Sequence, residues 1–396
     1  MRLSIYSLTG AKAMRQDERT SPGSHARPGH AAIPQIDAIR VLAMLSIFMQ
    51  HLWLTVIPNP ETTLQKIFRP VFTTGSDGVI LFNLISGFLL AMPHLGMQQR
   101  PFEGYLSFLR KRFFRIIPPY YLALVLFTIA NMLCFAYPLV PALVLLAQHL
   151  LFVNSLDYSN MLTNFSHFWY LGLLAQFYLF FPFVLRLFLR IGPTRAALSI
   201  VALCWGGWIF IAWYFHEVPG SYPDALENLM HFNLPGRLPE FAIGMWLVSV
   251  WKPSVSYQRC IASNKALLTF CIASGLYVIA GHPFLKVMNL ALFHIYDVPI
   301  CMFFFFLLMS PLGAGAGKSA PVRNFSRHSY SVYIVHHPIF SYVGVMPSTV
   351  VHTLGNFATL AVLLLPVSYL AAVVLDRTSA FLLKLPNRSG APEQLA

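Results

Sequence analysis

Ten long runs of mostly apolar residues dominate this sequence and limit the folds that it can adopt. A bilayer core about 30 Å thick is crossed by a helix of about 20 predominantly apolar residues. The runs that come close to this length are residues 36–57, 77–95, 116–137, 168–190, 196–216, 236–251, 265–281, 296–312, 329–346 and 356–376. They predict an all-α fold, a polytopic integral membrane helical bundle of about ten transmembrane helices.

The charge of the chain agrees with a membrane protein. Only 10% of the residues are charged, against about 25% in soluble proteins, which excludes a soluble globular fold. The formal net charge of +13 could indicate nucleic acid, but the basic residues are spread between the apolar runs and form no continuous stripe. We therefore expect membrane lipids, and no nucleic acid, as partners.

The positions of Lys and Arg predict the orientation, because short cytoplasmic loops retain positive charge. Of the 27 Lys and Arg, 22 fall in six segments, which are 1–35, 96–115, 186–195, 252–265, 313–328 and 377–396. The segments that alternate with these hold only 4. The sequence thus predicts a multi-pass protein of the cell inner (cytoplasmic) membrane with both termini in the cytoplasm.

An eleventh apolar run, Pro138 to Val153, has 16 residues and two prolines at its start. It favours a short re-entrant or interfacial helix near 138–153, since it is too short for a span. It opens the largest non-cytoplasmic segment, 138–167, which could meet a polar substrate or could simply be solvated. The polar residues singled out there are His149, Asn154, Asp157 and His167.

Three regions follow from this pattern. Residues 1–35 are polar and rich in Pro, Gly and Ser, and they predict a disordered cytoplasmic N-terminal tail, with Met14 as an alternative start. Residues 36–377 form the membrane domain, and 378–396 form a cytoplasmic C-terminal tail. The five cysteines lie far apart without a metal-ligand spacing, so we expect no disulfide framework and no metal site.

Two ionisable residues of the first run, Arg40 and His51, need a reason to be in a span, where each costs roughly 2.5 to 3.5 kcal/mol. Eleven residues of helix place them within about 20° of one face and about 16 Å apart along the axis. Arg40 then lies near the cytoplasmic edge and His51 past the midplane. They could be functional, or Arg40 could reach the headgroups while His51 bonds to a neighbouring helix.

Four cations, Arg110, Lys111, Arg112 and Arg115, precede the Pro118–Pro119 pair at the predicted inner face. Guanidinium groups suit the phosphates of a nucleotide-bearing cosubstrate. Clusters next to a membrane more often determine topology or contact anionic lipids.

The remaining candidates are weaker by themselves. Ser86, with the glycine and phenylalanine that follow it, is more often part of a packing notch than of a site. Arg237 and Glu240 could form a local ion pair or could line a cavity. His336 is by default a hydrogen-bonded core histidine.

Six blocks, read in order from about residue 36 to 377, resemble the acyltransferase 3 family of integral membrane proteins. IDAIRVLAMLSIFMQH resembles its first-helix motif, GVILFNLISGFLL its second-helix block, and RFFR followed by PPYY its Arg-x-x-Arg block. HFWYLGLLAQFYLFFP, which contains Trp169, is similar to a fourth block, and RLPEFAIG and SYSVYIVHHP to two more. Leu174, Ala175 and Ile80 stand where the family often has acidic residues.

The resemblance implies transfer of an acyl group, acetyl or succinyl, from cytoplasmic acyl-CoA to a hydroxyl of a cell-envelope glycan or lipid-linked sugar. It implies His51 as catalytic base, with Arg40 orienting. Acyl-CoA would be a cosubstrate, with no tightly bound cofactor. Arg112, Arg115 and Ser86 would bind that donor. The residues that would contact the acceptor are Trp169, Arg237, Glu240 and His336.

Two other functions stay open at this point. One keeps the chemistry but acylates a small metabolite such as an antibiotic. The other is a membrane transporter, since a bundle with buried charges and proline-broken helices also describes many carriers. Internal symmetry between the two halves would favour a transporter, and the sequence shows none.

Overall fold

The computed structural model describes residues 33–96, 100–157, 165–217, 229–251, 293–309, 311–344 and 353–384. The predicted span at 265–281 and most of both predicted tails lie outside these residues. Every regular element within them is a helix. In chain order they are α1 (Pro34–Val56), α2 (Thr63–Thr73), η1 (Thr74–Ser76), α3 (Asp77–Leu95), α4 (Tyr105–Cys134), α5 (Leu139–Leu150), η2 (Asn154–Leu156), η4 (Ser166–Phe168), α6 (Trp169–Ile191), α7 (Pro193–Val201), η5 (Ala202–Gly206), α8 (Gly207–Glu217), α10 (Leu234–Trp251), α13 (Phe293–Leu308), α14 (Pro311–Lys318), α15 (Ala320–Gly344) and α16 (Leu354–Lys384).

Six of the described helical segments are long and apolar enough to cross a membrane. They are Pro34–Val56, Thr63–Leu95, Tyr105–Cys134, Ser166–Ile191, Pro193–Ile211 and Leu354–Leu383. Asp297–Leu308 and Leu312–Lys318 make a seventh if this pair, bent by 70°, counts as one span. The prediction of an all-helical polytopic membrane protein is therefore confirmed. Two further predicted spans coincide with α10 and α15, which are not among the six.

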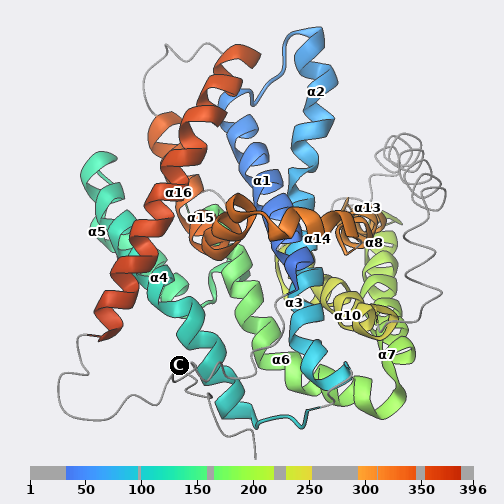
Figure 1. Ribbon diagram of the computed structural model, residues 1–396. Helices are drawn as coiled ribbons and strands as arrows, with labels where there is room; N and C mark the ends of the chain where they lie inside the picture. The colour runs from blue at the N-terminus through green and yellow to red at the C-terminus, as the bar shows by residue number, and fades with distance from the viewer. Residues whose placement is uncertain are drawn as a thin grey trace, which may run out of the picture. The chain divides into compact units, whose positions relative to one another are not determined.

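Helix α1 lies in the middle of the bundle, between α16 and α2 in Figure 1. It packs against α3 and α15, and α15 packs in turn against α16. Many of its apolar side chains, among them Ile39, Ala43 and Phe48, are fully buried, whereas Leu54 near its C-terminal end is exposed. α1 is thus the element around which the described helices pack.

Two contacts fix the relative direction of α1 and α15. The Ser326 hydroxyl donates to Asp37 near the start of both helices (2.6 Å). The side chains of His51 and His336 meet farther along both helices. The two helices therefore run in the same direction, which agrees with the orientation predicted for both from the basic residues.

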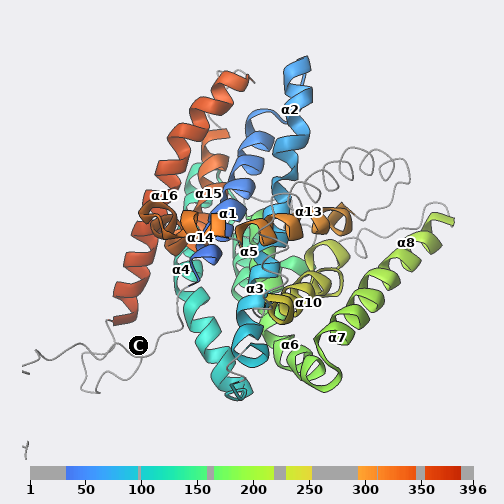
Figure 2. The ribbon, with the colours of Figure 1, turned by 45° about the vertical axis from the view of Figure 1, so that its right-hand side comes forward.

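The short helix α5 runs back along α4. At its C-terminal end, the carbonyl of His149 accepts a hydrogen bond from Tyr120 (3.2 Å), and the carbonyl of Leu150 accepts one from Tyr121 (2.5 Å). Both tyrosines lie in the middle of α4. The prediction of a short helix near 138–153 is confirmed, and this contact favours the re-entrant alternative over the interfacial one. The view turned by 45° also shows the C-terminal part of α4 beside α5 (Figure 2).

The segment after α5 argues against the solvated alternative for the polar residues singled out in 138–167. His149, Asn154 and His167 are buried, with at most 2% of each residue exposed. The physical reason is the direction of α5, which carries the chain back toward the middle of the bundle. These residues are part of the protein interior and are not solvated.

The second-helix notch at Ser86–Phe88 is a place of close helix approach. A Cβ atom added at Gly87 would collide with the carbonyl oxygen of Phe241 on α10. A Cβ atom added at Gly244 of α10 would likewise collide with the carbonyl oxygen of Leu84. Small residues at such positions let two membrane helices pack closely, so the packing interpretation holds for Gly87.

We expect Gly87→Ala to destabilise the protein, because the added methyl group must push backbone against backbone. Overpacking of this kind costs typically 1 to 3 kcal/mol. The measurement is the melting temperature of purified protein in detergent. Gly315→Ala is the matched control, since an added methyl there meets no described atom within 4 Å. Equal melting temperatures for both variants would contradict the close-packing argument.

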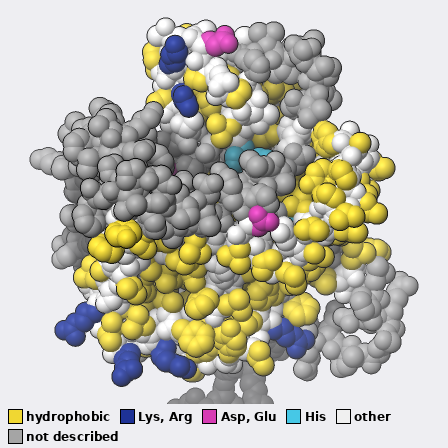
Figure 3. Space-filling model, turned by 180° about the vertical axis from the view of Figure 1, so that it is seen from behind, with side chains coloured by type: hydrophobic (Ala, Val, Ile, Leu, Met, Phe, Trp, Pro, Cys, Tyr) yellow, Lys and Arg dark blue, Asp and Glu magenta, His cyan; other side chains and the backbone are white. Residues whose placement is uncertain are grey.

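One face of the described residues is covered largely by hydrophobic side chains, with most of its Lys and Arg gathered along the lower edge (Figure 3). A broad apolar surface with cations at its rim is what a membrane protein presents to lipid. This distribution agrees with the multi-pass assignment.

The predicted orientation can be tested at two exposed positions between helices. Glu61 follows α1, and Ser319 lies between α14 and α15. In a cysteine-free background and intact cells, a membrane-impermeant thiol reagent should label Glu61→Cys and leave Ser319→Cys unlabelled. The reverse pattern would show that the orientation predicted from the basic residues is wrong.

Candidate active site

His51 of α1 and His336 of α15 form a side-chain pair at the centre of the bundle. Nδ1 of His51 lies 2.8 Å from Nε2 of His336. Their rings are nearly parallel, with 9° between the planes. His336 is fully buried. The two residues are 285 positions apart in the sequence. They meet because α1 and α15 run side by side in the same direction, which brings the two rings to the same depth in the bundle.

Two more histidines complete a cluster around this pair. The ring of His337 meets the ring of His51 edge-on, at 4.9 Å between centroids. The ring of His167, from η4, stacks on His337 at 4.8 Å. The sequence indicates His167 only as one polar residue of the segment 138–167, and it does not predict His337 as a site residue. The only signal for them was two adjacent histidines before a proline and one histidine before the Trp169 block. Within the described residues, no three His, Cys, Asp or Glu side chains are arranged to hold one metal ion.

Pro338 explains why His167 docks against α15. A proline has no backbone N–H, so the carbonyl four residues earlier loses its helical donor. That carbonyl belongs to Ile334, and Nε2 of His167 lies 3.2 Å from it. The proline within α15 thus creates the acceptor that holds His167 beside the histidine pair.

A basic cavity of about 360 Å³ lies among α1, α3, α4, α6, α15 and α16. Four arginines line it, namely Arg40, Arg112, Arg115 and Arg327. Nε of Arg112 is buried without a hydrogen-bond partner among the described residues, and its guanidinium lies over the Phe108 ring. The cavity therefore gathers positive charge and keeps one buried donor that an anion could satisfy.

All the residues that the sequence assigns to the donor, together with Arg40, line this one cavity. Ser86 of α3 joins Arg112 and Arg115 there. Arg40 also pairs with Asp37 at 3.9 Å, one turn earlier on α1. Arg40 therefore lies with the donor arginines and about 16 Å along the helix from His51.

Four tyrosines line the basic cavity, and one of them, Tyr333, also contacts the histidine cluster. The four are Tyr170, Tyr178, Tyr330 and Tyr333. The Tyr333 hydroxyl donates to the carbonyl oxygen of His167, and its ring lies 5.7 Å from that of His336. Tyr333 thus touches both the cavity and the cluster. Tyr333 could not be predicted as a site residue from the sequence, because a tyrosine in an apolar run carries no signal of its own.

Arg237 and Glu240, which are buried, and Trp169, which is half-buried, form a separate group. Arg237 pairs with Glu240 at 2.8 Å, and its guanidinium lies over the Trp169 ring at 5.4 Å. Asn83 of α3 donates to the other oxygen of Glu240 at 2.5 Å. Of the two alternatives, the structure shows the local ion pair, and none of these residues lines the basic cavity.

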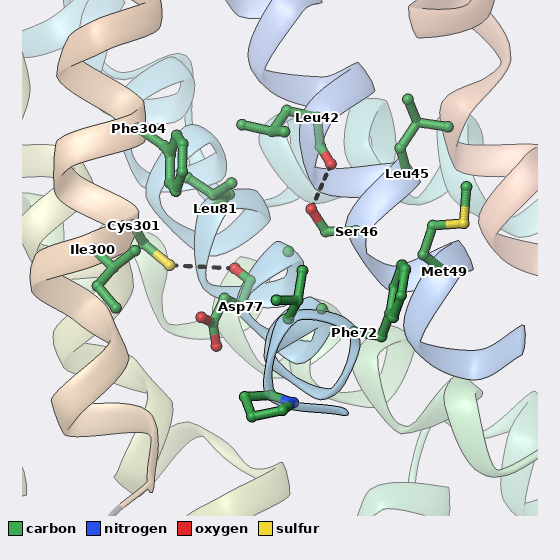
Figure 4. Close-up of a pocket in the computed structure, with 14 residues that line it drawn as sticks. Leu42, Leu45, Ser46, Met49, Phe72, Asp77, Leu81, Ile300, Cys301 and Phe304 are labelled. Carbon is green, nitrogen blue, oxygen red and sulfur yellow. Dashed lines mark hydrogen bonds between the residues drawn. The ribbon is translucent and has the colours of Figure 1, made fainter. Parts of the chain in front are cut away.

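A larger, mainly apolar cavity of about 570 Å³ lies between α1, α2, α3 and α13. Figure 4 shows Asp77 at its edge, where the carbonyl of this residue accepts a hydrogen bond from Cys301 (3.4 Å). The α1 side chains that line this cavity, such as Leu42 and Met49, lie on the face opposite His51, given about 100° per residue. It is therefore not continuous with the histidine cluster across α1.

The fold and the site together define a class: a polytopic membrane protein in which a basic cavity adjoins a cluster of four histidines. The chain belongs to the acyltransferase 3 family, whose model, described as an acyltransferase domain, matches residues 33–377. This match confirms the resemblance seen in the sequence.

Two kinds of curated protein resemble the chain. O-acetyltransferase OatA of Staphylococcus aureus is 24% identical over 338 residues, which cover 78% of this chain and 51% of that protein. Acyltransferase MdmB of Streptomyces mycarofaciens is 27% identical over 256 residues, 61% of this chain and 63% of that protein. The chain thus spans about half the length of OatA. No solved structure matches.

Proposed function

We propose that this protein transfers an acyl group, acetyl or succinyl, from cytoplasmic acyl-CoA to a hydroxyl of a cell-envelope glycan or lipid-linked sugar. The observation that carries the proposal is the position of Tyr333, which joins the four-arginine cavity to the histidine cluster. Membership in the acyltransferase 3 family and the likeness to an O-acetyltransferase support the reaction class and the hydroxyl acceptor.

The donor is suited to the basic cavity. Acyl-CoA carries several phosphate groups on its nucleotide end, and guanidinium groups bind phosphate with two parallel hydrogen bonds. The buried Nε of Arg112, which has no hydrogen-bond partner among the described residues, fits such a ligand. A cavity of about 360 Å³ takes part of this molecule, so the nucleotide end would extend toward the cytoplasm from exposed Arg115.

His51 would act as the general base. It removes the proton from the acceptor hydroxyl while the oxygen attacks the carbonyl carbon of the thioester. The new C–O bond forms, the C–S bond breaks, and the proton on His51 passes to the sulfur of the departing CoA. No redox step and no further reactant is needed.

The location follows from the two substrates. Acyl-CoA is charged and cytoplasmic, whereas an envelope glycan is accessible from the outer side, so the protein would act across the inner membrane with both termini in the cytoplasm. The basic cavity includes Arg40 near the start of α1, and His51 lies farther along that helix, which supports a donor that reaches inward from the cytoplasmic side.

Mass spectrometry of envelope glycans tests the proposal. Cells with the protein should carry a glycan with an added acetyl or succinyl mass, and cells without it, or with His51→Gln, should lack that mass. Identical glycans in all three strains would contradict the envelope acceptor. A mass added instead to a small secreted metabolite would assign that metabolite as the acceptor.

A further inference from the structure

The hydrogen bonds of α15 determine which nitrogen of His336 carries the proton. Nδ1 of His336 lies 2.8 Å from the carbonyl oxygen of Tyr333 and 3.1 Å from that of Val332. Carbonyl oxygens only accept, so Nδ1 must donate. A neutral imidazole has one N–H, and Nε2 of a neutral His336 is therefore an acceptor.

This assignment passes on to His51. Nδ1 of His51 lies 2.8 Å from Nε2 of His336. Because that Nε2 accepts, Nδ1 of His51 must carry the proton. The lone pair of a neutral His51 then lies on Nε2. Among the described residues, Nε2 of His51 has no hydrogen-bond partner, and it is not one of the fully buried polar atoms without a partner. The basic nitrogen is thus left open to a reactant.

We propose that His336 is a positioning residue, which holds His51 in the tautomer whose Nε2 is the base. The inference rests on the proposed function, since it concerns the base of that reaction. It replaces the acceptor contact that the sequence suggested for His336. Its physical basis is a chain of two hydrogen bonds that begins at the α15 backbone and ends at the catalytic ring.

The other histidines do not compete for this role. His167 donates from Nε2 to the Ile334 carbonyl. Its ring stacks on the ring of His337 at 4.8 Å between centroids. Among the described residues, the titratable side chains that interact with His51 are His336 and His337 from α15 and His167 from η4. Of these, only His336 is within hydrogen-bond distance of the His51 ring among the described contacts.

Three substitutions at His336 separate positioning from packing. His336→Gln keeps an oxygen acceptor for the His51 N–H, so we expect kcat within about fivefold of wild type. His336→Ala removes the acceptor, and the ring can then adopt the wrong tautomer. We expect kcat to fall about 10- to 100-fold, part of the gain that a positioned base supplies, with KM for acyl-CoA unchanged. The control is His94→Gln, on a histidine that bonds the Arg100 carbonyl at the end of α3.

His336→Glu gives a readout that a structural role would not move. A carboxylate beside His51 stabilises its protonated form, and only the neutral form is a base. The acidic limb of the kcat–pH profile should therefore move to higher pH by about one unit or more, while His336→Gln should leave it in place.

The outcomes distinguish the two proposals. If wild-type protein transfers no acyl group, the proposed function fails. If wild type is active and His51→Gln is inactive, the proposed function holds, and the His336 variants then test only the positioning role. Equal losses in membrane-inserted His336→Gln and His336→Ala would then overturn it, as would an acidic limb that His336→Glu leaves unmoved. Should His336→Glu not insert, the comparison of Gln with Ala decides.

Discussion

Replacing His51 with Gln should leave a membrane-inserted protein that binds acyl-CoA and transfers almost no acyl group. A positioned general base contributes typically 10² to 10⁴-fold, so kcat should fall by about that factor while KM for acyl-CoA changes little. Gln keeps the polarity of the side chain and can still donate to Nε2 of His336, but it cannot accept the proton of the acceptor hydroxyl.

This variant should not fail by misfolding. Within the described part of the chain, the His51 side chain makes one hydrogen bond to the rest of the fold, to His336 of α15, and the Gln side chain can make a hydrogen bond in its place. His94→Gln serves as the control for loss of a histidine elsewhere. A His51→Gln protein that retains more than about a tenth of wild-type kcat, far above the loss of a base, would make His51 a structural residue.

Replacing Arg112 or Arg115 with Ala should weaken donor binding specifically. Hydrogen bonds to charged groups contribute about 1.5 to 3 kcal/mol, so KM for acyl-CoA should rise about 10- to 100-fold, with a smaller change for the acceptor. Lys at either position should restore only part of the affinity, because a point charge lacks the two-pronged geometry of guanidinium.

The matched control lies on the same helix. Arg110 is exposed, lies over the Phe114 ring at 5.5 Å and is not among the residues that line the basic cavity. Arg110→Ala should leave KM for acyl-CoA unchanged. If all three variants only reduce the amount of inserted protein, with normal kinetics in what remains, the cluster determines topology and does not bind donor.

Sequence patterns predicted the local parts of this fold closely. The first run, 36–57, became α1 over Pro34–Val56, and the run at 168–190 became α6 over Trp169–Ile191. Apolar length alone fixes such helices, because the bilayer leaves them no alternative. The direction of α5 could not be predicted in this way, since it depends on the hydroxyls of Tyr120 and Tyr121 that hold its end.

The site was predictable where one helix determines it. Eleven residues of α1 separate Arg40 from His51, and that spacing alone indicates that they work at different depths. The partners across helices were not predictable. His336 meets His51, and Arg327 joins Arg40, because α1 and α15 pack against each other. The basic residues predict that these two helices share a direction, but no short-range pattern reports that helices so distant in sequence are neighbours.

The glycine of the second-helix block shows the same limit. From the Ser-Gly-Phe sequence alone, this glycine could belong either to a packing notch between helices or to a functional site. The carbonyl of Phe241, which a side chain at Gly87 would strike, decides for the notch at that residue. Ser86, its neighbour, faces the basic cavity, so one short block serves packing and the cavity at once.

The most direct test of the account uses membrane vesicles of both orientations and radiolabelled acetyl-CoA or succinyl-CoA added outside them. Inverted vesicles, which expose the cytoplasmic face, should transfer the labelled acyl group to envelope glycan when they contain wild-type protein. The label should be absent from right-side-out vesicles and from inverted vesicles with His51→Gln. Equal labelling by wild type and His51→Gln, or labelling only in right-side-out vesicles, would contradict a cytoplasmic donor that reacts at His51.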